Sequence, residues 1–340
     1  MAEIARPAPI DWGERLRNWR EAFLTLHLPE ERMDPVSRWL ILTRAGVTPM
    51  TLTSGLIGGL LAVHAPERHW FYFIVALIGL ELAHCCNNLI NDYFDLTGGV
   101  DTSDAPRALY APHPVLSGWV TKEQLWRAIL LLNVIDLVIM LFLFAVRGWP
   151  VVLFAVFGLF ISVFYVAPPV RLKHMGLGEP GVFIVWGPLM VGGTYYITTG
   201  EVPGWVWMAS LPYAILVTSV LIGKHIDKLP YDSGKGVHTL PVILGERNSV
   251  LLNQGLMISF YAIIVLMVLT GMLGFGALVV LAGLPLLFKT LDFYSKPKPA
   301  TPPPNYPVWP LWYVSAAFIH TRRAGGLFVL GLFLNWIFGL

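Results

Sequence analysis

Residues 70–101 read WFYFIVALIGLELAHCCNNLINDYFDLTGGVD, and this stretch decides the fold. Its apolar part, residues 70–91, is long enough to cross the hydrocarbon core of a bilayer, which takes about 20 residues of α-helix. Asparagine and aspartate gather at the end of that run. Because acidic side chains are costly inside a membrane, a cluster of them where a span ends predicts a functional site.

The whole composition agrees with a membrane protein. Of the 340 residues, 56% are hydrophobic and only 13% are charged, which is about half the charged share of a soluble domain. The net charge of +2 is too small to indicate a nucleic-acid partner. The only cysteines, Cys85 and Cys86, are adjacent in an apolar run, so neither a disulfide framework nor a zinc site is expected.

Nine apolar segments qualify, or nearly qualify, as membrane spans. Their runs are long, continuous and rich in leucine, whereas the strands of a membrane β-barrel would alternate apolar and polar residues. We therefore expect an all-α membrane protein whose nine spans lie at approximately residues 46–64, 70–91, 125–146, 150–167, 181–199, 205–223, 250–272, 274–291 and 324–340.

The distribution of positive charge predicts the orientation. Of the 23 Lys and Arg residues, 21 lie in the N-terminal tail or at the loops and helix ends that follow the even-numbered spans. The positive-inside rule assigns that side to the cytoplasm. We expect a multi-pass protein of the cell inner (cytoplasmic) membrane with a cytoplasmic N-terminus. Residues 296–310, KPKPATPPPNYPVWP, would form a proline-rich cytoplasmic connector between spans eight and nine.

Residues 1–44 are expected to form a cytoplasmic or interfacial segment that precedes a membrane domain at residues 45–340. They are rich in Arg, Glu and Pro and do not resemble a signal peptide. Between Trp12 and Leu28, apolar residues recur at helical spacing with arginines between them. This pattern is typical of a helix that lies on an anionic membrane surface, and a flexible tail with some helix fits it equally.

The first acidic cluster lies at the end of span two. On a helix, Asn88 and Asn91 lie one turn before Asp92 and Asp95 respectively. A Gly-Gly pair then ends the helix and lets the chain curl back, which returns Asp101 toward the other acids. An all-oxygen cluster of this kind suits magnesium, although a solvated loop that caps a helix would also be acidic.

The second acidic cluster lies at the end of span six. Asp227 and Asp232 are five residues apart, a poor spacing for one helical face, but Pro230 should break the helix and let the two acids converge. Positive charge for phosphate oxygens comes from Lys224, Lys228 and Lys235. An ordinary positive-inside loop is the alternative. Divalent cations bridging two acidic clusters would hold a diphosphate that bare carboxylates repel.

Several segments together resemble the UbiA superfamily of intramembrane prenyltransferases, over about residues 45–340. They are NDYFD at 91–95, HPVLSGWVT at 113–121, YVAPPVRLK at 165–173, GLGE at 176–179 and GPLMVGGTYY at 187–196. The last two are most similar to the 1,4-dihydroxy-2-naphthoate polyprenyltransferases of menaquinone synthesis. The chain departs from the family in two places: His113 replaces an arginine, and GKHID at 223–227 replaces Asn-Asn-x-x-Asp, with one extra residue before Asp232.

The resemblance implies a ring of nine helices around a central cavity with a cytoplasmic cap. It also implies Mg²⁺-dependent transfer of a polyprenyl group from polyprenyl diphosphate to an aromatic acceptor, with 1,4-dihydroxy-2-naphthoate as the expected acceptor. The magnesium ligands, direct or through water, would be Asp92, Asp95, Asp101, Asp227 and Asp232. The diphosphate would contact Asn88, Asn91, Arg171, Lys173, Lys228 and Lys235.

Within this scheme the residues expected to act in catalysis are Asp92, Asp95, Asp227 and Tyr165. Tyr165, Trp186, Tyr195 and Tyr196 would shield the allylic cation with their ring faces or serve only in packing. His84 and His225 would transfer protons or serve only as hydrogen-bond partners.

Three other functions remain open from the sequence. They are a prenyltransferase for another acceptor of the quinone or chlorin type, a UbiA-type terpene cyclase, and a transporter. A transporter would carry acids along an ion path, but here the acids lie at the helix ends on one face of the membrane. Asp136 in span three is the exception, and no role follows from its position.

Overall fold

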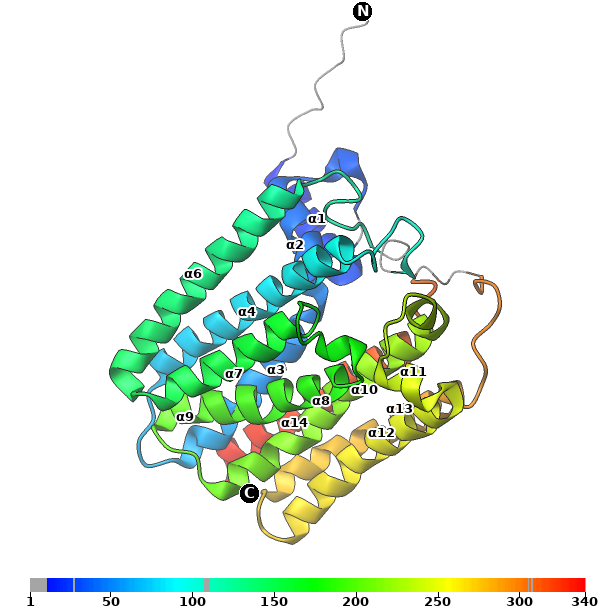
Figure 1. Cartoon of the computed structure of the whole chain (residues 1–340). Helices are drawn as coiled ribbons and strands as arrows, with labels where there is room; N and C mark the ends of the chain where they lie inside the picture. The colour runs from blue at the N-terminus through cyan, green and yellow to red at the C-terminus, as the bar shows by residue number, and fades with distance from the viewer. Residues whose placement is uncertain (1–10, 27, 107–110, 305, 307, 340) are drawn as a thin grey trace, which may run out of the picture.

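The computed structural model describes residues 11–26, 28–106, 111–304, 306 and 308–339, and within these ranges it contains helices and no strand (Figure 1). The main helices are α1 (Trp12–Thr25), α2 (Pro35–Leu42), α3 (Pro49–Leu61), α4 (Trp70–Thr97), α6 (Lys122–Arg147), α7 (Pro150–Phe164), α8 (Gly178–Ile184), α9 (Gly193–Thr199), α10 (Gly204–Gly234), α11 (Leu240–Leu244), α12 (Glu246–Leu269), α13 (Leu284–Tyr294) and α14 (Tyr313–Phe338). Short helical segments are η1 (Glu30–Arg32), η2 (Ala45–Val47), η3 (Ala62–His64), η4 (Leu172–His174), η5 (Val185–Gly192) and η6 (Phe275–Gly283).

Eight helical stretches in the described part of the chain are long and apolar enough to cross a membrane, which confirms eight of the nine expected spans. The remaining expected span, the fourth along the chain at residues 150–167, is the helix α7, which is apolar but has only 15 residues. The last span begins at Tyr313 rather than at residue 324. The sequence places its start too late because Arg322 and Arg323 interrupt the apolar pattern, whereas the helix continues through them with both side chains exposed.

Helix α10 lies at the centre of the bundle. Of the 18 residues that form its membrane-spanning stretch, 78% are buried, and the helix contacts α3, α8, α12 and α14. The largest hydrophobic core cluster forms around it and includes Tyr213, Leu216 and Phe260. By contrast, only 11% of the residues in the membrane-spanning stretch of α6 are buried, so most of the surface of α6 is available to contact lipid. Polar groups on α10 are therefore held on a rigid and deeply packed element.

The fifth span is interrupted in its middle. Between α8 and α9, the eight residues of η5 form a π-helix that contains Pro188. A proline removes a backbone donor and so favours a local change of hydrogen-bond pattern. Next to it, a Cβ atom on Gly187 would lie only 2.6 Å from the Cβ of Ala214. The absence of a side chain at Gly187 therefore lets this span lie directly against α10.

The N-terminal helices pack beside the end of α4. Helix α1 confirms the helix expected after Trp12, and Asp11 caps it by accepting a hydrogen bond from the N–H of Glu14 at 2.8 Å. Asp34 caps α2 in the same way, with the N–H of Ser37 at 2.7 Å. After α2, the chain turns at Arg44, which has a φ of +54°, and enters the first span. This turn carries the Arg44 side chain toward the end of α4.

Candidate active site

A cavity of about 700 Å³ lies inside the bundle. Its wall is largely apolar and comes mainly from α4, α6, α7, η5, α10, α14 and the segment before α14. The charged and amide side chains that line it are Arg44, Asn87, Asn88, Asn91, Asn133, Asp136 and Lys224. A cavity that joins a long apolar wall to a polar end fits a ligand with an apolar chain and an anionic head.

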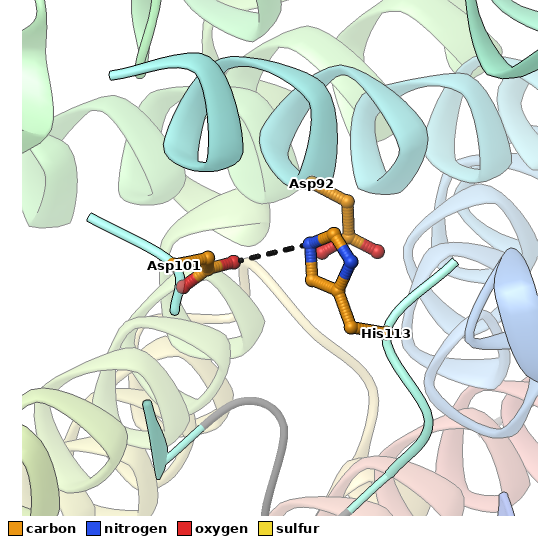
Figure 2. A group of neighbouring side chains, drawn as sticks. All are labelled: Asp92, Asp101 and His113. Carbon is orange, nitrogen blue, oxygen red and sulfur yellow. Dashed lines mark ion pairs between the residues drawn. The ribbon is translucent and has the colours of Figure 1, made fainter. Parts of the chain in front are cut away.

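The acidic group beside this cavity is formed by Asp92, Asp101 and His113 (Figure 2). Each contributes one ligand-type atom, these atoms lie within 4.8 Å of one another, and all three residues are buried. Asp92 belongs to the last turns of α4. Asp101 returns to it because Gly99 adopts a φ of +74° and because the N–H of Asp101 donates to the carbonyl of Asp95 at 2.9 Å. The structure therefore contains the return of Asp101 toward Asp92 that the Gly-Gly pair predicted.

The environment of Asp101 fits a cation. Burial, and then the nearby carboxylates of Asp95 and Asp92, raise the pKa of Asp101. Its Oδ1 atom is buried and accepts no hydrogen bond from the described part of the chain. A divalent cation would relieve both conditions, because it attracts the carboxylates and fills the empty acceptor position.

His113 lies close to Asp101. Its Nδ1 atom accepts hydrogen bonds from the N–H groups of Val115 and Leu116, both at 3.3 Å. The tautomer inferred from these bonds carries its proton on Nε2, which lies 3.6 Å from the Oδ2 of Asp101. His113 thus supplies a positive dipole beside the carboxylate at a position where an arginine is usual in the resembled family.

Three of the carboxylates in this region each form an ion pair with a basic side chain. Arg44 forms a buried ion pair with Asp92. The Nζ atom of Lys173 lies 2.8 Å from the Oδ2 of Asp95, and the Nζ atom of Lys228 lies 3.2 Å from the Oδ1 of Asp232. These buried pairs place positive charge directly beside the carboxylates, where phosphate oxygens of a metal-bound diphosphate would come. The sequence singled out both lysines but not Arg44.

The two asparagines of the first cluster have different surroundings. The Nδ2 of Asn88 donates to the carbonyl of Thr43 at 2.9 Å, which ties α4 to the end of α2. Asn91 lines the cavity, and its Oδ1 is buried without a hydrogen-bond partner among the residues that the structure describes. Of the two, Asn91 has the group that is available to a ligand.

The second acidic cluster does not converge as expected. Helix α10 continues through Pro230 to Gly234, so the prediction that Pro230 breaks the helix is wrong. Asp227 and Asp232 consequently point in different directions, as their five-residue spacing on a regular helix requires. Asp232 is fully buried beside Lys228, whereas the carboxylate of Asp227 accepts hydrogen bonds from backbone N–H groups at the start of α14.

A hydrogen-bonded chain of three side chains leads from the cavity into the protein. Tyr165 lines the cavity, and its hydroxyl lies 3.5 Å from the Nε2 of His225. The Nδ1 of His225 lies 2.6 Å from the Oε1 of Glu179, and both side chains are almost completely buried. This places the hydroxyl of Tyr165 in a fixed position at the cavity wall.

The remaining expected site residues divide into two groups. Trp186 lines the cavity and packs edge-on against His84, with ring centroids 5.3 Å apart. The cavity wall formed by the described residues does not include Tyr195 or Tyr196, and the hydroxyl of Tyr196 donates to the carbonyl of Arg147. Both Arg171 and Lys235 are exposed.

Comparison with known proteins identifies the family. The sequence model of the UbiA prenyltransferase family matches residues 51–315, more than half of the chain. The chain belongs to the UbiA prenyltransferase family. It is therefore a multi-span membrane transferase of prenyl groups.

Individual relatives of this UbiA protein support the same assignment. The chain is 26% identical to the 1,4-dihydroxy-2-naphthoate octaprenyltransferase of Bacillus subtilis, over 74% of this chain and 77% of the relative. It is 25% identical to the 2-carboxy-1,4-naphthoquinone phytyltransferase of Synechocystis, over 70% of this chain and 75% of the relative.

Solved structures of UbiA homologues share its fold. The apo structure of a homologue from Aeropyrum pernix superposes with a TM-score of 0.65 at 17% identity, covering 85% of this chain and 97% of the other. A homologue from Archaeoglobus fulgidus, described as bound to GPP and Mg²⁺, superposes with a TM-score of 0.54 at 16% identity, covering 86% and 99%.

Two buried residues of this UbiA site were missed by sequence reasoning. Arg44 had been assigned to the N-terminal segment, and Glu179 had been noted only as part of a motif. Glu179 carried a signal that could have found it, because an acid at the start of an apolar span is rarely there without a partner. Arg44 carried a weaker one, because an arginine that directly precedes a span is common on the cytoplasmic side.

Proposed function

We propose that this UbiA protein transfers a polyprenyl group from polyprenyl diphosphate to 1,4-dihydroxy-2-naphthoate, in a Mg²⁺-dependent step of menaquinone biosynthesis at the cell inner (cytoplasmic) membrane. The observation that carries the proposal is the apolar cavity that opens beside the buried pair Asp92 and Asp101. The activity named for the Bacillus subtilis relative, and the GPP and Mg²⁺ named for the Archaeoglobus fulgidus homologue, support it.

In this proposal Asp92 and Asp101 hold Mg²⁺, directly or through water, and Asp95 and Asp232 contribute negative charge beside them. Mg²⁺ would stabilise the charge that develops on the leaving diphosphate. Arg44, Lys173 and Lys228 attract phosphate oxygens, and Asn91 orients the head group. The allylic C–O bond breaks with its electron pair going to the diphosphate, and the acceptor ring carbon supplies the electron pair of the new C–C bond. The ring then regains its aromaticity by losing the substituent on that carbon, as a proton or, from the carboxylated carbon, as CO2.

The cavity wall would protect and orient the reacting groups. The rings of Tyr165 and Trp186 face the cavity, where they shield the allylic cation from water. Lys224 also lines the cavity and makes no ion pair or hydrogen bond within the described residues. An ammonium group in a largely apolar wall attracts an anion, and the carboxylate of a hydroxynaphthoate has the matching charge.

The test is product analysis with purified protein, Mg²⁺ and labelled geranylgeranyl diphosphate. Separate reactions contain 1,4-dihydroxy-2-naphthoate, 4-hydroxybenzoate, homogentisate or no acceptor. We expect a prenylated naphthalene product to dominate. A preference for either benzenoid acceptor would contradict the naphthoate assignment, and a cyclised hydrocarbon formed without acceptor would replace the transferase by a terpene cyclase.

A further inference from the structure

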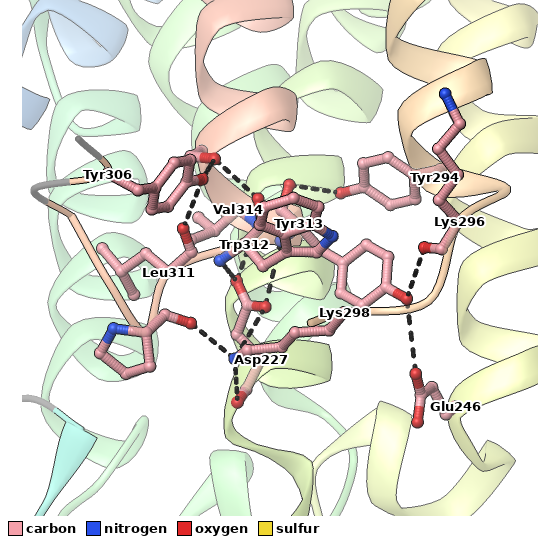
Figure 3. A network of polar contacts seen from close by, with 12 residues as sticks. Asp227, Glu246, Tyr294, Lys296, Lys298, Tyr306, Leu311, Trp312, Tyr313 and Val314 are labelled. Carbon is pink, nitrogen blue, oxygen red and sulfur yellow. Dashed lines mark hydrogen bonds and ion pairs between the residues drawn. The ribbon is translucent and has the colours of Figure 1, made fainter. Parts of the chain in front are cut away.

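Asp227 lies on the face of α10 that supports the start of α14 (Figure 3). Its Oδ2 atom accepts hydrogen bonds from the N–H of Trp312 at 2.8 Å and from the N–H of Val314 at 3.0 Å. Its Oδ1 atom accepts from the N–H of Tyr313 at 3.0 Å and from the Nζ of Lys298 at 3.4 Å. Three successive backbone donors of the last helix thus end on one carboxylate.

This arrangement uses the full acceptor capacity of the side chain. A carboxylate offers about four lone-pair positions, two on each oxygen. Each oxygen of Asp227 already has two donors. A negative charge at a helix N-terminus is also stabilised by the exposed N–H groups and the helix dipole. Asp227 is therefore satisfied by α14 and Lys298 without a metal ion.

Gly223, one helical turn earlier, makes the close contact feasible. A Cβ atom on Gly223 would lie 2.7 Å from the hydroxyl of Tyr294 and 3.1 Å from the backbone of Val314. The related naphthoate enzymes usually have an asparagine here. Gly223 and Asp227 share one helical face, so both positions contact the start of α14.

The proline-rich connector is fixed at the same point. The Nζ of Lys298 donates to the carbonyl of Asp227 at 3.3 Å and to the carbonyl of Pro310 at 2.5 Å. Lys298 therefore joins the beginning and the end of the connector to α10. Beyond this junction, four residues of the connector and of the first turn of α14 lie in the cavity wall: Val308, Leu311, Val314 and Ser315.

We propose that Asp227 is a positioning residue, which holds the connector and the first turn of α14 against α10 and thereby shapes the cavity that receives the prenyl chain. In this proposal Asp227 does not bind the metal, contrary to the expectation from the sequence, and the carboxylates near Asp92 bind it instead. The proposal rests on the proposed function only in naming the prenyl substrate.

The first experiment measures metal binding without turnover. Electron paramagnetic resonance follows the binding of Mn²⁺, in the presence of inorganic diphosphate, to wild type, Asp227→Asn and Asp92→Asn. We expect Asp227→Asn to bind Mn²⁺ like wild type and the matched control Asp92→Asn to lose about tenfold or more in affinity. An equal loss in both variants would overturn the proposal.

The second experiment measures the contact itself. Hydrogen exchange of the peptide that contains Trp312, Tyr313 and Val314 should accelerate in Asp227→Asn, because the amide side chain presents two donors where acceptors are needed. Lys298→Met should accelerate it as well, and Asp92→Asn should not. Unchanged exchange in Asp227→Asn would show that the carboxylate does not hold this turn.

The kinetic signature separates positioning from a merely structural role. In Asp227→Asn and Lys298→Met we expect the KM for geranylgeranyl diphosphate to rise by about tenfold, with the Mg²⁺ concentration for half-maximal rate unchanged. A raised Mg²⁺ requirement with unchanged KM would assign Asp227 to the metal. If wild type transfers no prenyl group, the proposed function fails, while Mn²⁺ binding and exchange still decide the role of Asp227.

Discussion

Arg44 and Asp92 form a buried ion pair across 48 residues of sequence. The pair joins the turn between α2 and the first span to the last turns of α4. Since Asp92 also belongs to the acidic group beside the cavity, the N-terminal segment contributes directly to the candidate active site.

Breaking this pair should cost both stability and substrate binding. Arg44→Met removes the Arg44 guanidinium from the buried Asp92, and removal of one member of a buried ion pair typically costs about 3–5 kcal/mol. We expect a lower unfolding temperature in detergent and a higher KM for the prenyl diphosphate. Arg44→Lys keeps the charge and should recover most of the stability. A melting temperature of Arg44→Met equal to wild type would contradict the importance of the pair.

Removal of divalent cations should abolish activity. Asp101 is buried, its pKa is raised and its Oδ1 atom accepts no hydrogen bond, so the acidic group and an anionic diphosphate need a cation between them. Prenyl transfer is measured in excess EDTA and again after Mg²⁺ is added in excess over the chelator. The rate should fall to background and then return, and full activity in EDTA would remove the metal-dependent mechanism.

Lys224 should discriminate between charged and neutral acceptors. Lys224→Gln removes the ammonium group from the cavity wall but keeps a polar side chain of similar length. We expect a higher KM for 1,4-dihydroxy-2-naphthoate and no change for 1,4-dihydroxynaphthalene, which lacks the carboxylate. Lys122→Gln, at an exposed position at the start of α6, is the control. Equal effects on both acceptors would place the role of Lys224 at the diphosphate instead.

The expected orientation is testable by cysteine labelling. Ser103, Ser233 and Thr301 are exposed, and the charge distribution assigns all three to the cytoplasmic side. Single cysteines at these positions should resist a membrane-impermeant reagent in intact cells and react after lysis. Ready labelling of any of them from outside would require a different topology.

Much of the membrane architecture follows from sequence because apolar length and charge distribution depend on local composition. The first acidic cluster was also accessible, since helical spacing and a Gly-Gly turn determine where Asp101 goes. The position of Arg44 could not be predicted from the sequence, because it depends on a turn with positive φ and on packing against α4. For Tyr195 and Tyr196 the sequence left cation shielding and packing open, and within the described residues neither lies in the cavity wall, since the π-helix η5 shifts the faces of the residues that follow it.

The second acidic cluster shows how tertiary packing overrides a local rule. Pro230 predicted a break, but α10 is packed on several sides and continues past it. The faces of Asp227 and Asp232 are then set by the helix, not by the shared chemistry of two carboxylates. Only the position of α14, far away in sequence, reveals what Asp227 contacts.

The unequal lengths of α6 and α7 have a consequence for the bilayer itself. At about 1.5 Å per residue, the 26 residues of α6 rise about 39 Å and the 15 residues of α7 about 22 Å. A short turn joins the two helices (Figure 1), at Gly148 and Trp149. The difference in length therefore lies at the opposite end, where Tyr165 directly follows α7. Because a hydrocarbon core is about 30 Å thick, we expect the proposed prenyl transfer to take place in a depression below the lipid head groups. The polyprenyl chain can then stay at the depth of the acyl chains, and neither substrate nor product has to be lifted into water.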